Sequence, residues 1–317
     1  MPVTAALDCW FLSGPTASGK TVVALELAER LEAEIISLDS MAIYRGMDIG
    51  TAKPTIDERQ KVPHHLLDLV DPVVEFSVSQ YVAAAEENVR EIRRRGREVL
   101  FAGGTPLYLK ALLRGIFQGP PADWEFRRQV EDEVRQVGVE ALHRRLQQVD
   151  PLSAAKLHPH DTRRMIRALE VYKLTGQPIS HLQTQFDDAR PADTCKVFVL
   201  QWPRDALYAR IDARVERMFA QGLVDEVRGL LVRFGRLGRT ASQAVGYREA
   251  IQHLRGEIDL TETIQRVKTR THQFARRQET WFRSLGECRR VPLREGVSPR
   301  AVAEQILEMP ASSRLRS

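Results

Sequence analysis

Residues Gly14–Thr21 have the types and the spacing of a phosphate-binding loop. They read GPTASGKT and fit the pattern G-x-x-x-x-G-K-[ST]. The glycines let the backbone curl until successive N–H groups point inward, and a helix that starts at the end of the loop adds the positive end of its dipole. Lys20 supplies a positive charge to bound phosphates, and the Thr21 hydroxyl can be a ligand of Mg²⁺. We expect a di- or triphosphate to bind to the whole loop, which consists of Gly14, Pro15, Thr16, Ala17, Ser18, Gly19, Lys20 and Thr21.

Asp39 follows a short strand predicted over residues 34–38. Ligands of open α/β sheets bind outside the carboxyl ends of the strands, so Asp39 should face the loop. Its carboxylate could hold Mg²⁺, accept a proton or cap the following turn, and the sequence leaves these three roles open.

A second polar position follows the strand predicted over residues 98–102. Gly103 and Gly104 permit a close approach to a ligand at the end of this strand, and Thr105 offers a hydroxyl there. A tight strand–helix turn would use the same two glycines, so the pair alone does not prove a site.

Alternating strands and helices must position these residues. A strand predicted over residues 9–13 precedes the phosphate loop, and apolar residues recur at helical spacing after it. Helices are predicted over residues 77–95, 106–114, 204–220 and 260–284, and a further core strand over 196–201. The alternation predicts an α/β fold with a P-loop NTPase-like, doubly wound parallel sheet.

A helical insertion interrupts the alternation, because residues 124–176 contain polar helical patterns and no predicted strand. We expect residues 1–118 to form the first part of the core, 119–190 the insertion domain, 191–310 the return to the core with basic C-terminal helices, and 311–317 a disordered tail.

Composition favours a polyanionic partner over a membrane. The chain has 317 residues, with 47 Lys and Arg against 42 Asp and Glu, and the arginines cluster in its second half. Arginine suits phosphate backbones, although solvated charge is the simpler explanation of such runs. Three widely spaced cysteines, Cys9, Cys195 and Cys288, give neither a metal-ligand pattern nor a disulfide framework. We expect a cytoplasmic monomer without a membrane-spanning segment.

The phosphate loop alone leaves several classes of protein open. A small-molecule or nucleoside kinase would bind ATP in this loop and could use the Arg-rich insertion as a lid. A GTPase or ATPase switch is disfavoured, because the chain has no Asn-Lys-x-Asp guanine reader and no apolar strand that ends in a clear Walker-B pair. A non-enzymatic nucleotide-binding module would not need acidic and hydroxyl groups near the phosphates.

Several motifs, taken jointly, resemble one family over nearly the whole chain. They are GPTASGKT at 14–21, DSMAIYRGMDIGTAKP at 39–54, PHH at 63–65, GGTPLY at 103–108, RALEVY at 167–172, AVGYRE at 244–249 and RRQETWF at 276–282. This order is similar to that of the tRNA dimethylallyltransferases, or tRNA isopentenyltransferases. The chain departs from many members at Ala42-Ile43, where they carry Gln-Val, and it resembles the bacterial type because no Cys/His zinc finger follows residue 284.

The resemblance implies a reaction and roles for residues. The loop would hold the diphosphate of dimethylallyl diphosphate rather than ATP, with Arg214 as a further ligand, and the prenyl group would move to N6 of adenosine 37 in the tRNA anticodon stem-loop. Asp39 would act as general base, with Lys20, Thr21 and Thr105 as further catalytic residues and Mg²⁺ bound at Thr21 and Asp39. The implied tRNA-binding residues are Asp39, Ser40, Met41, Ala42, Thr105, Arg127, Arg163, Arg164, Met165, Ile166, Arg167, Tyr247, Arg248, Arg276, Arg277, Gln278 and Trp281.

Overall fold

The computed structural model describes residues 6–117, 119–183 and 191–309 of the 317-residue chain. The described residues divide into two compact units, a smaller one that begins at residue 114 and ends at 183, and a larger one made of 6–113 and 191–309. The predicted tail at 311–317 lies outside the described residues.

The larger unit contains a parallel sheet of six strands in the order β3-β2-β4-β1-β5-β6. The strands are β1 (Trp10–Ser13), β2 (Ala33–Ser37), β3 (His64–His65), β4 (Glu98–Ala102), β5 (Val197–Gln201) and β6 (Arg289–Pro292). The register places Phe11 of β1 between Phe101 of β4 and Val197 of β5. The four predicted strands are therefore confirmed, and the doubly wound parallel sheet with them.

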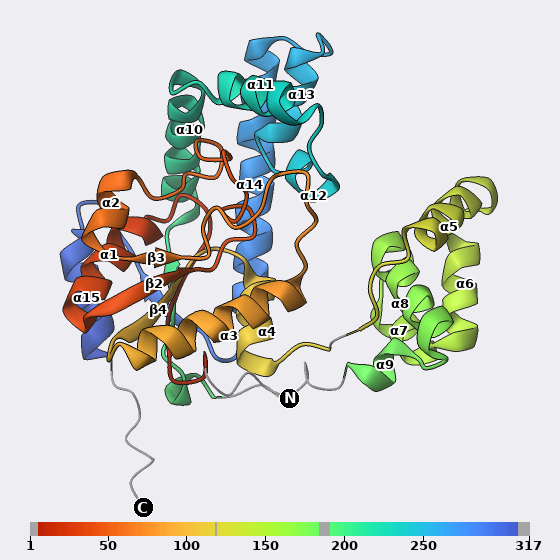
Figure 1. The fold of residues 1–317 in the computed structure, drawn as a ribbon, viewed down its shortest axis with the longest axis horizontal. Helices are drawn as coiled ribbons and strands as arrows, with labels where there is room; N and C mark the ends of the chain where they lie inside the picture. Colours follow the sequence, from red (N-terminus) through yellow and green to blue (C-terminus); the bar gives the residue numbers. More distant parts are fainter. Residues whose placement is uncertain (1–5, 118, 184–190, 310–317) are drawn as a thin grey trace, which may run out of the picture. The chain divides into compact units, whose positions relative to one another are not determined.

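Helices cover both faces of this sheet (Figure 1). On one face, α1 (Lys20–Leu31), α10 (Arg204–Ala220) and α15 (Pro299–Glu308) enclose a core that includes Leu12 and Leu100. On the other face lie α3 (Val78–Arg94) and α4 (Pro106–Arg114). Both helices begin within one residue of the predicted start. For α3 the start is fixed by Ser77, which forms a capping box with Gln80.

A second group of helices packs at one end of α10 (Figure 1) and consists of α11 (Leu223–Phe234), α12 (Arg239–Ser242) and α13 (Tyr247–Leu254). The long α14 (Leu260–Ser284) runs alongside α10. The stretch at 41–54, here called the 41–54 loop, shares a core with this group through Ile43, Tyr44 and Met47. The 41–54 loop is thus anchored by its apolar residues. The short α2 (Ile56–Lys61) follows it.

The smaller unit contains helices and no strand among its described residues. Its helices are α5 (Trp124–Val137), α6 (Val139–Val149), α7 (Pro151–Lys156), α8 (Thr162–Thr175) and α9 (Ile179–Leu182). They enclose a core of their own that contains Phe126, Val130, Leu146 and Leu169. A 3₁₀ turn at Ala192–Thr194 then leads to β5 in the larger unit. Among the described helices, none is long and apolar enough to cross a lipid bilayer.

Candidate functional site

The phosphate loop has the predicted strand–turn–helix geometry. It begins after β1 and ends where α1 starts at Lys20. Gly19 has a φ of 86° and Ala17 a φ of 61°, so the backbone turns through left-handed conformations that bring successive N–H groups to one side. The loop thus forms an anion-binding concavity at the N-terminus of a twelve-residue helix.

The Lys20 ammonium has no carboxylate partner within ion-pair distance in the described part of the chain. Its Nζ donates hydrogen bonds to the carbonyl oxygens of Gly14 (3.0 Å) and Pro15 (2.7 Å). Burial lowers the pKa of Lys20 to about 7, the nearby Arg214 guanidinium lowers it further in the same direction, and Asp39 opposes both. A cation that is buried without a counter-ion indicates a site for an anion.

Helix α10 adds two arginines to this site. The pKa of Arg214 is lowered, chiefly by burial, while Asp39 raises it, and its guanidinium lies 3.5 Å from the Thr51 carbonyl oxygen. One turn earlier, Arg210 donates to the carbonyl oxygen of Ala17 (2.9 Å) and stacks on the Trp202 ring at 4.4 Å. Of these two arginines, only Arg214 was predicted from the sequence as a diphosphate ligand. The four-residue spacing from Arg210 to Arg214 was the signal that could have identified Arg210, because such residues share a face of a helix.

Asp39, Ser40 and Thr105 come together, as expected for residues at the ends of neighbouring parallel strands. The Thr105 hydroxyl oxygen accepts a hydrogen bond from the Ser40 amide (3.0 Å). The Oδ1 atom of Asp39 accepts from the Met41 amide (2.8 Å), which is the turn-capping role that the sequence left open. Within the described residues, Oδ2 of Asp39 has no hydrogen-bond donor, so one carboxylate oxygen remains available to a ligand.

Gly104 allows the end of β4 to meet the phosphate loop. A Cβ atom at this position would lie 2.7 Å from Nε2 of Gln278 and 3.3 Å from the Gly14 carbonyl oxygen. The Gln278 side chain, from α14, donates to the Gly104 carbonyl oxygen and accepts from the Thr16 amide (2.8 Å). Gly104 therefore serves a close approach to Gln278 and the phosphate loop, whereas the prediction was a close approach to a ligand, and Gln278 ties the phosphate loop to β4.

Five residues implied as tRNA contacts have buried side chains, which corrects the expectation for them. The side chains that cannot reach RNA in this conformation are those of Ala42, Met165, Ile166, Tyr247 and Gln278. Met165 and Ile166 lie on the face of α8 that packs in the core of the smaller unit, and Ala42 lies at the start of the 41–54 loop. A motif preserves the residue type but does not tell which side of the helix faces the solvent.

The remaining implied RNA contacts divide into exposed and paired side chains. In the larger unit, Arg248, Arg276 and Arg277 are exposed, whereas Met41 and Trp281 are partly buried. In the smaller unit, Arg163 and Arg164 are exposed. Arg127 and Arg167 instead form ion pairs with Glu170, whose side chain is 0% exposed. Burial raises the pKa of Glu170, but hydrogen bonds from the two arginines lower it more, so the carboxylate is charged.

The histidine pair at 64–65 makes hydrogen bonds within the fold. His64 Nδ1 lies 2.7 Å from the Val62 carbonyl oxygen, and His65 Nε2 lies 2.6 Å from a carboxylate oxygen of Glu34. The described residues contain no group of three or more His, Cys, Asp or Glu side chains that could hold a metal ion. Mg²⁺ is usually bound by one or two carboxylates together with phosphates and water, and the exposed Thr21 hydroxyl and the available oxygen of Asp39 fit that donor set.

The fold and the site define a P-loop α/β protein that is built to bind a phosphorylated ligand beside a carboxylate and a hydroxyl. The family model of the IPP transferases matches residues 42–285. The chain is 54% identical to a tRNA dimethylallyltransferase of Rhodopirellula baltica over 89% of this chain and 87% of the relative. It is 48% identical to that of Geobacter metallireducens over 87% of this chain and 89% of the relative. The chain therefore belongs to the IPP transferase family.

Solved structures agree with this assignment. A tRNA isopentenylpyrophosphate transferase from Bacillus halodurans superimposes with a TM-score of 0.68 at 39% identity and covers 95% of this chain and 94% of its own. A eukaryotic dimethylallyltransferase, described as acting on tRNA, gives a TM-score of 0.71 at 26% identity, over 90% of this chain and 74% of its own. The predicted resemblance is thereby confirmed.

Proposed function

We propose that the tRNA dimethylallyltransferase activity of this chain moves the dimethylallyl group of dimethylallyl diphosphate to N6 of adenosine 37, beside the anticodon. The observation that carries this proposal is the pair of cations, Lys20 and Arg214, that converge on the phosphate loop without a carboxylate paired to either among the described residues. Two charges of this kind match a diphosphate group. Asp39 lies close enough to influence the pKa values of both.

The chemistry needs a stabilised leaving group and a proton acceptor. The N6 amine forms a bond to C1 of the dimethylallyl group while the bond from C1 to the diphosphate oxygen breaks, and the diphosphate departs with the electron pair. Lys20, Arg214 and the N–H groups of the loop stabilise the departing charge. The available carboxylate oxygen of Asp39 accepts the proton that the amine loses.

The Thr21 hydroxyl and a carboxylate oxygen of Asp39 would hold Mg²⁺, which supplies further positive charge to the diphosphate. Thr105 would hold the segment that carries Asp39, since its hydroxyl accepts from the Ser40 amide. An adenosine that is stacked in an RNA loop cannot enter such a site, so we expect the base to be flipped out.

The exposed arginines support an RNA partner. Arg163 and Arg164 on α8, and Arg276 and Arg277 on α14, present guanidinium groups to solvent. Such groups suit the phosphates of an anticodon stem-loop, which proteins recognise largely through its backbone and shape.

Nucleoside analysis tests the proposal. Unmodified tRNA is incubated with the purified chain, dimethylallyl diphosphate and Mg²⁺, then digested, and the nucleosides are identified by mass. We expect N6-dimethylallyladenosine, and a tRNA with guanosine at position 37 should give none. Phosphoryl transfer from ATP, without a prenylated nucleoside, would instead support the kinase alternative.

A further inference from the structure

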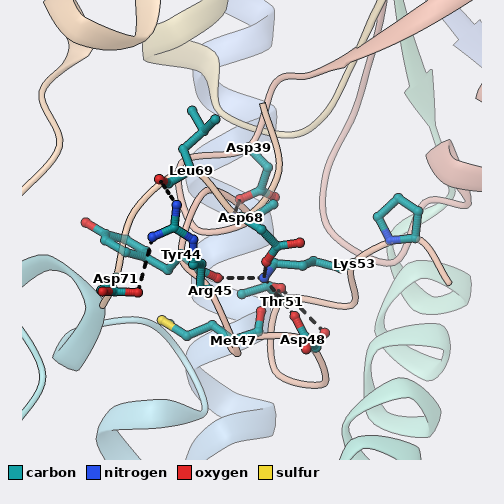
Figure 2. Close-up of polar contacts among 12 residues, drawn as sticks. Asp39, Tyr44, Arg45, Met47, Asp48, Thr51, Lys53, Asp68, Leu69 and Asp71 are labelled. Atoms are coloured by element: carbon teal, nitrogen blue, oxygen red, sulfur yellow. Dashed lines mark hydrogen bonds and ion pairs between the residues drawn. The ribbon is translucent and has the colours of Figure 1, made fainter. Parts of the chain in front are cut away.

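The 41–54 loop is fastened from the inside by Lys53 (Figure 2). The Lys53 side chain is 1% exposed, and its ammonium donates to the Tyr44 carbonyl oxygen (2.6 Å). It also pairs with Asp48 (2.7 Å) and Asp68 (2.6 Å). These contacts join parts of the loop to one another and to Asp68, but they do not tie the loop to α11 and α13.

The tie to the helices is made by Glu226 of α11. Its Oε2 atom accepts hydrogen bonds from the amides of Asp48 (3.0 Å) and Ile49 (2.7 Å), and its Oε1 atom faces the amide of Gly50 (3.4 Å). The Tyr247 hydroxyl, from the start of α13, donates to Oε1. Two helices thus join at one carboxylate, which binds three successive N–H groups of the loop.

The loop backbone packs closely against the Tyr247 ring at Gly50. A Cβ atom at position 50 would come within 2.4 Å of a ring carbon of Tyr247, so only glycine fits between the backbone and the ring. The Tyr247 ring and the Glu226 carboxylate together restrict the backbone of residues 48–50.

The next residue of the loop contacts the diphosphate site. Thr51 follows Gly50 directly, and its carbonyl oxygen is the hydrogen-bond partner that the structure gives the Arg214 guanidinium, at 3.5 Å. The position of this carbonyl therefore depends on the contacts of Glu226 and Tyr247 one residue away.

We propose that Glu226 and Tyr247 are positioning residues of the diphosphate site, which hold the 41–54 loop so that the Thr51 carbonyl keeps Arg214 directed at the phosphate loop. The inference rests on the proposed role of Arg214 as a diphosphate ligand. It does not place either residue in contact with the substrate.

Two variants test this inference. Glu226→Gln loses the charge and one acceptor oxygen, so it cannot satisfy all three amides, and Tyr247→Phe loses only the hydroxyl. Calorimetry with dimethylallyl diphosphate and Mg²⁺, in the absence of tRNA, should show about tenfold weaker binding for Glu226→Gln and a smaller loss for Tyr247→Phe. The matched control is Asp225→Asn, which removes a charge from an exposed neighbour on α11 and should bind as the wild type does.

A double-mutant cycle separates positioning from general stability. In an Arg214→Ala background, Glu226→Gln should cause no further loss of donor affinity, because the group it positions is gone. The affinity for tRNA should stay unchanged in both single variants. Additive losses in the cycle, an equal loss of tRNA affinity, or donor binding by Glu226→Gln that equals the wild type would each overturn the inference. Failure of the wild type itself to bind the donor would contradict the proposed function instead.

Discussion

The two carboxylate oxygens of Asp39 differ in their contacts. One oxygen caps the turn at Met41, and within the described chain the other has no donor. The capping role explains how the carboxylate is held at the end of β2, and it does not compete with a second role for the other oxygen. The proposed functions as base and as ligand of Mg²⁺ therefore remain to be separated by experiment.

The variant Asp39→Asn separates them, because an asparagine keeps the shape and the cap but cannot take a proton at neutral pH. For a general base we expect kcat to fall by about 10²–10⁴-fold with little change in KM for either substrate. A metal ligand predicts instead weaker donor binding that added Mg²⁺ partly restores. Steady-state kinetics over a Mg²⁺ series measures both, with the exposed Asp57→Asn as control, and a wild-type kcat would remove Asp39 from the mechanism.

Lys20 gives the site a pH dependence with a definite sign. Burial and Arg214 lower its pKa to about 7, so at pH 8 the amine of the ligand-free protein is mostly neutral. A bound diphosphate favours the charged form and raises that pKa, so binding takes up a proton. The affinity for the donor should consequently decrease as the pH rises above about 7, the ligand-free pKa.

Calorimetry in buffers of different ionisation enthalpy measures this uptake. At pH 8 we expect a net uptake of protons on donor binding, because Lys20, with a pKa of about 7, is mostly neutral there before the donor binds. The variant Lys20→Met should bind more weakly and take up almost no proton. Equal uptake by the variant and the wild type would assign the proton to another group.

Sequence reasoning predicted the residues of the site where topology alone decides their position. Asp39 and Thr105 follow parallel strands that neighbour each other, so their meeting was predictable. Gln278 and Tyr247 were misread as RNA contacts, because their burial depends on how α13 and α14 pack against distant segments. Arg210 was missed although it touches the loop, and its four-residue spacing from Arg214 was the one signal in the sequence that pointed to it.

Among the elements, length and periodicity decided which ones could be predicted. The long helices α10 and α14 have the predicted bounds, because an amphipathic pattern repeats over several turns. The outer strands β3 and β6 were not predicted, since β3 has only two residues and β6 (Arg289–Pro292) lacks the apolar run that identified β1. Helices α11 and α15 were not predicted either, and α11 carries Glu226, so the anchoring of the 41–54 loop was not visible in the sequence.

Helix α8 presents two kinds of arginine, and the pairing in the structure changes what is expected of them. Arg167 donates to Glu170 and to the Pro120 carbonyl oxygen (3.0 Å), so its charge is largely compensated within the unit. Arg167→Ala should lower the stability of the smaller unit by about 1–3 kcal/mol, because it leaves a buried carboxylate with one partner fewer. Faster hydrogen exchange in α5 and α8 would reveal this loss.

Arg163→Ala is the matched variant on the same helix. Its side chain is exposed, so stability should change little, while tRNA affinity falls and the slope of log K against log salt decreases by about 0.7–0.9 for one lost phosphate contact. Binding titrations over a salt series measure the slope. The assignment of α8 to the RNA surface would fail if Arg163→Ala left both affinity and slope unchanged.

At the level of the entire chain, the two substrates place different demands on the two units. Each unit has its own hydrophobic core. All the residues proposed for the diphosphate site belong to the unit that contains the sheet, whereas the proposed RNA contacts come from both. The donor should therefore stabilise one unit, and the tRNA both of them.

Hydrogen exchange of the intact chain, measured with each substrate alone, distinguishes these effects. Donor at about 100 times its Kd should slow exchange in residues 14–21 and 39–54 by up to about 100-fold, and α5–α8 should exchange as in the free protein. Unmodified tRNA should in addition slow exchange in α8, where Arg163 and Arg164 are exposed. The control Lys20→Met should lose the donor effect and keep the tRNA effect, because the amine serves the diphosphate alone. Protection of α8 by the donor alone would mean that the two units are coupled before the RNA binds, and absence of protection by tRNA would exclude α8 from the RNA surface.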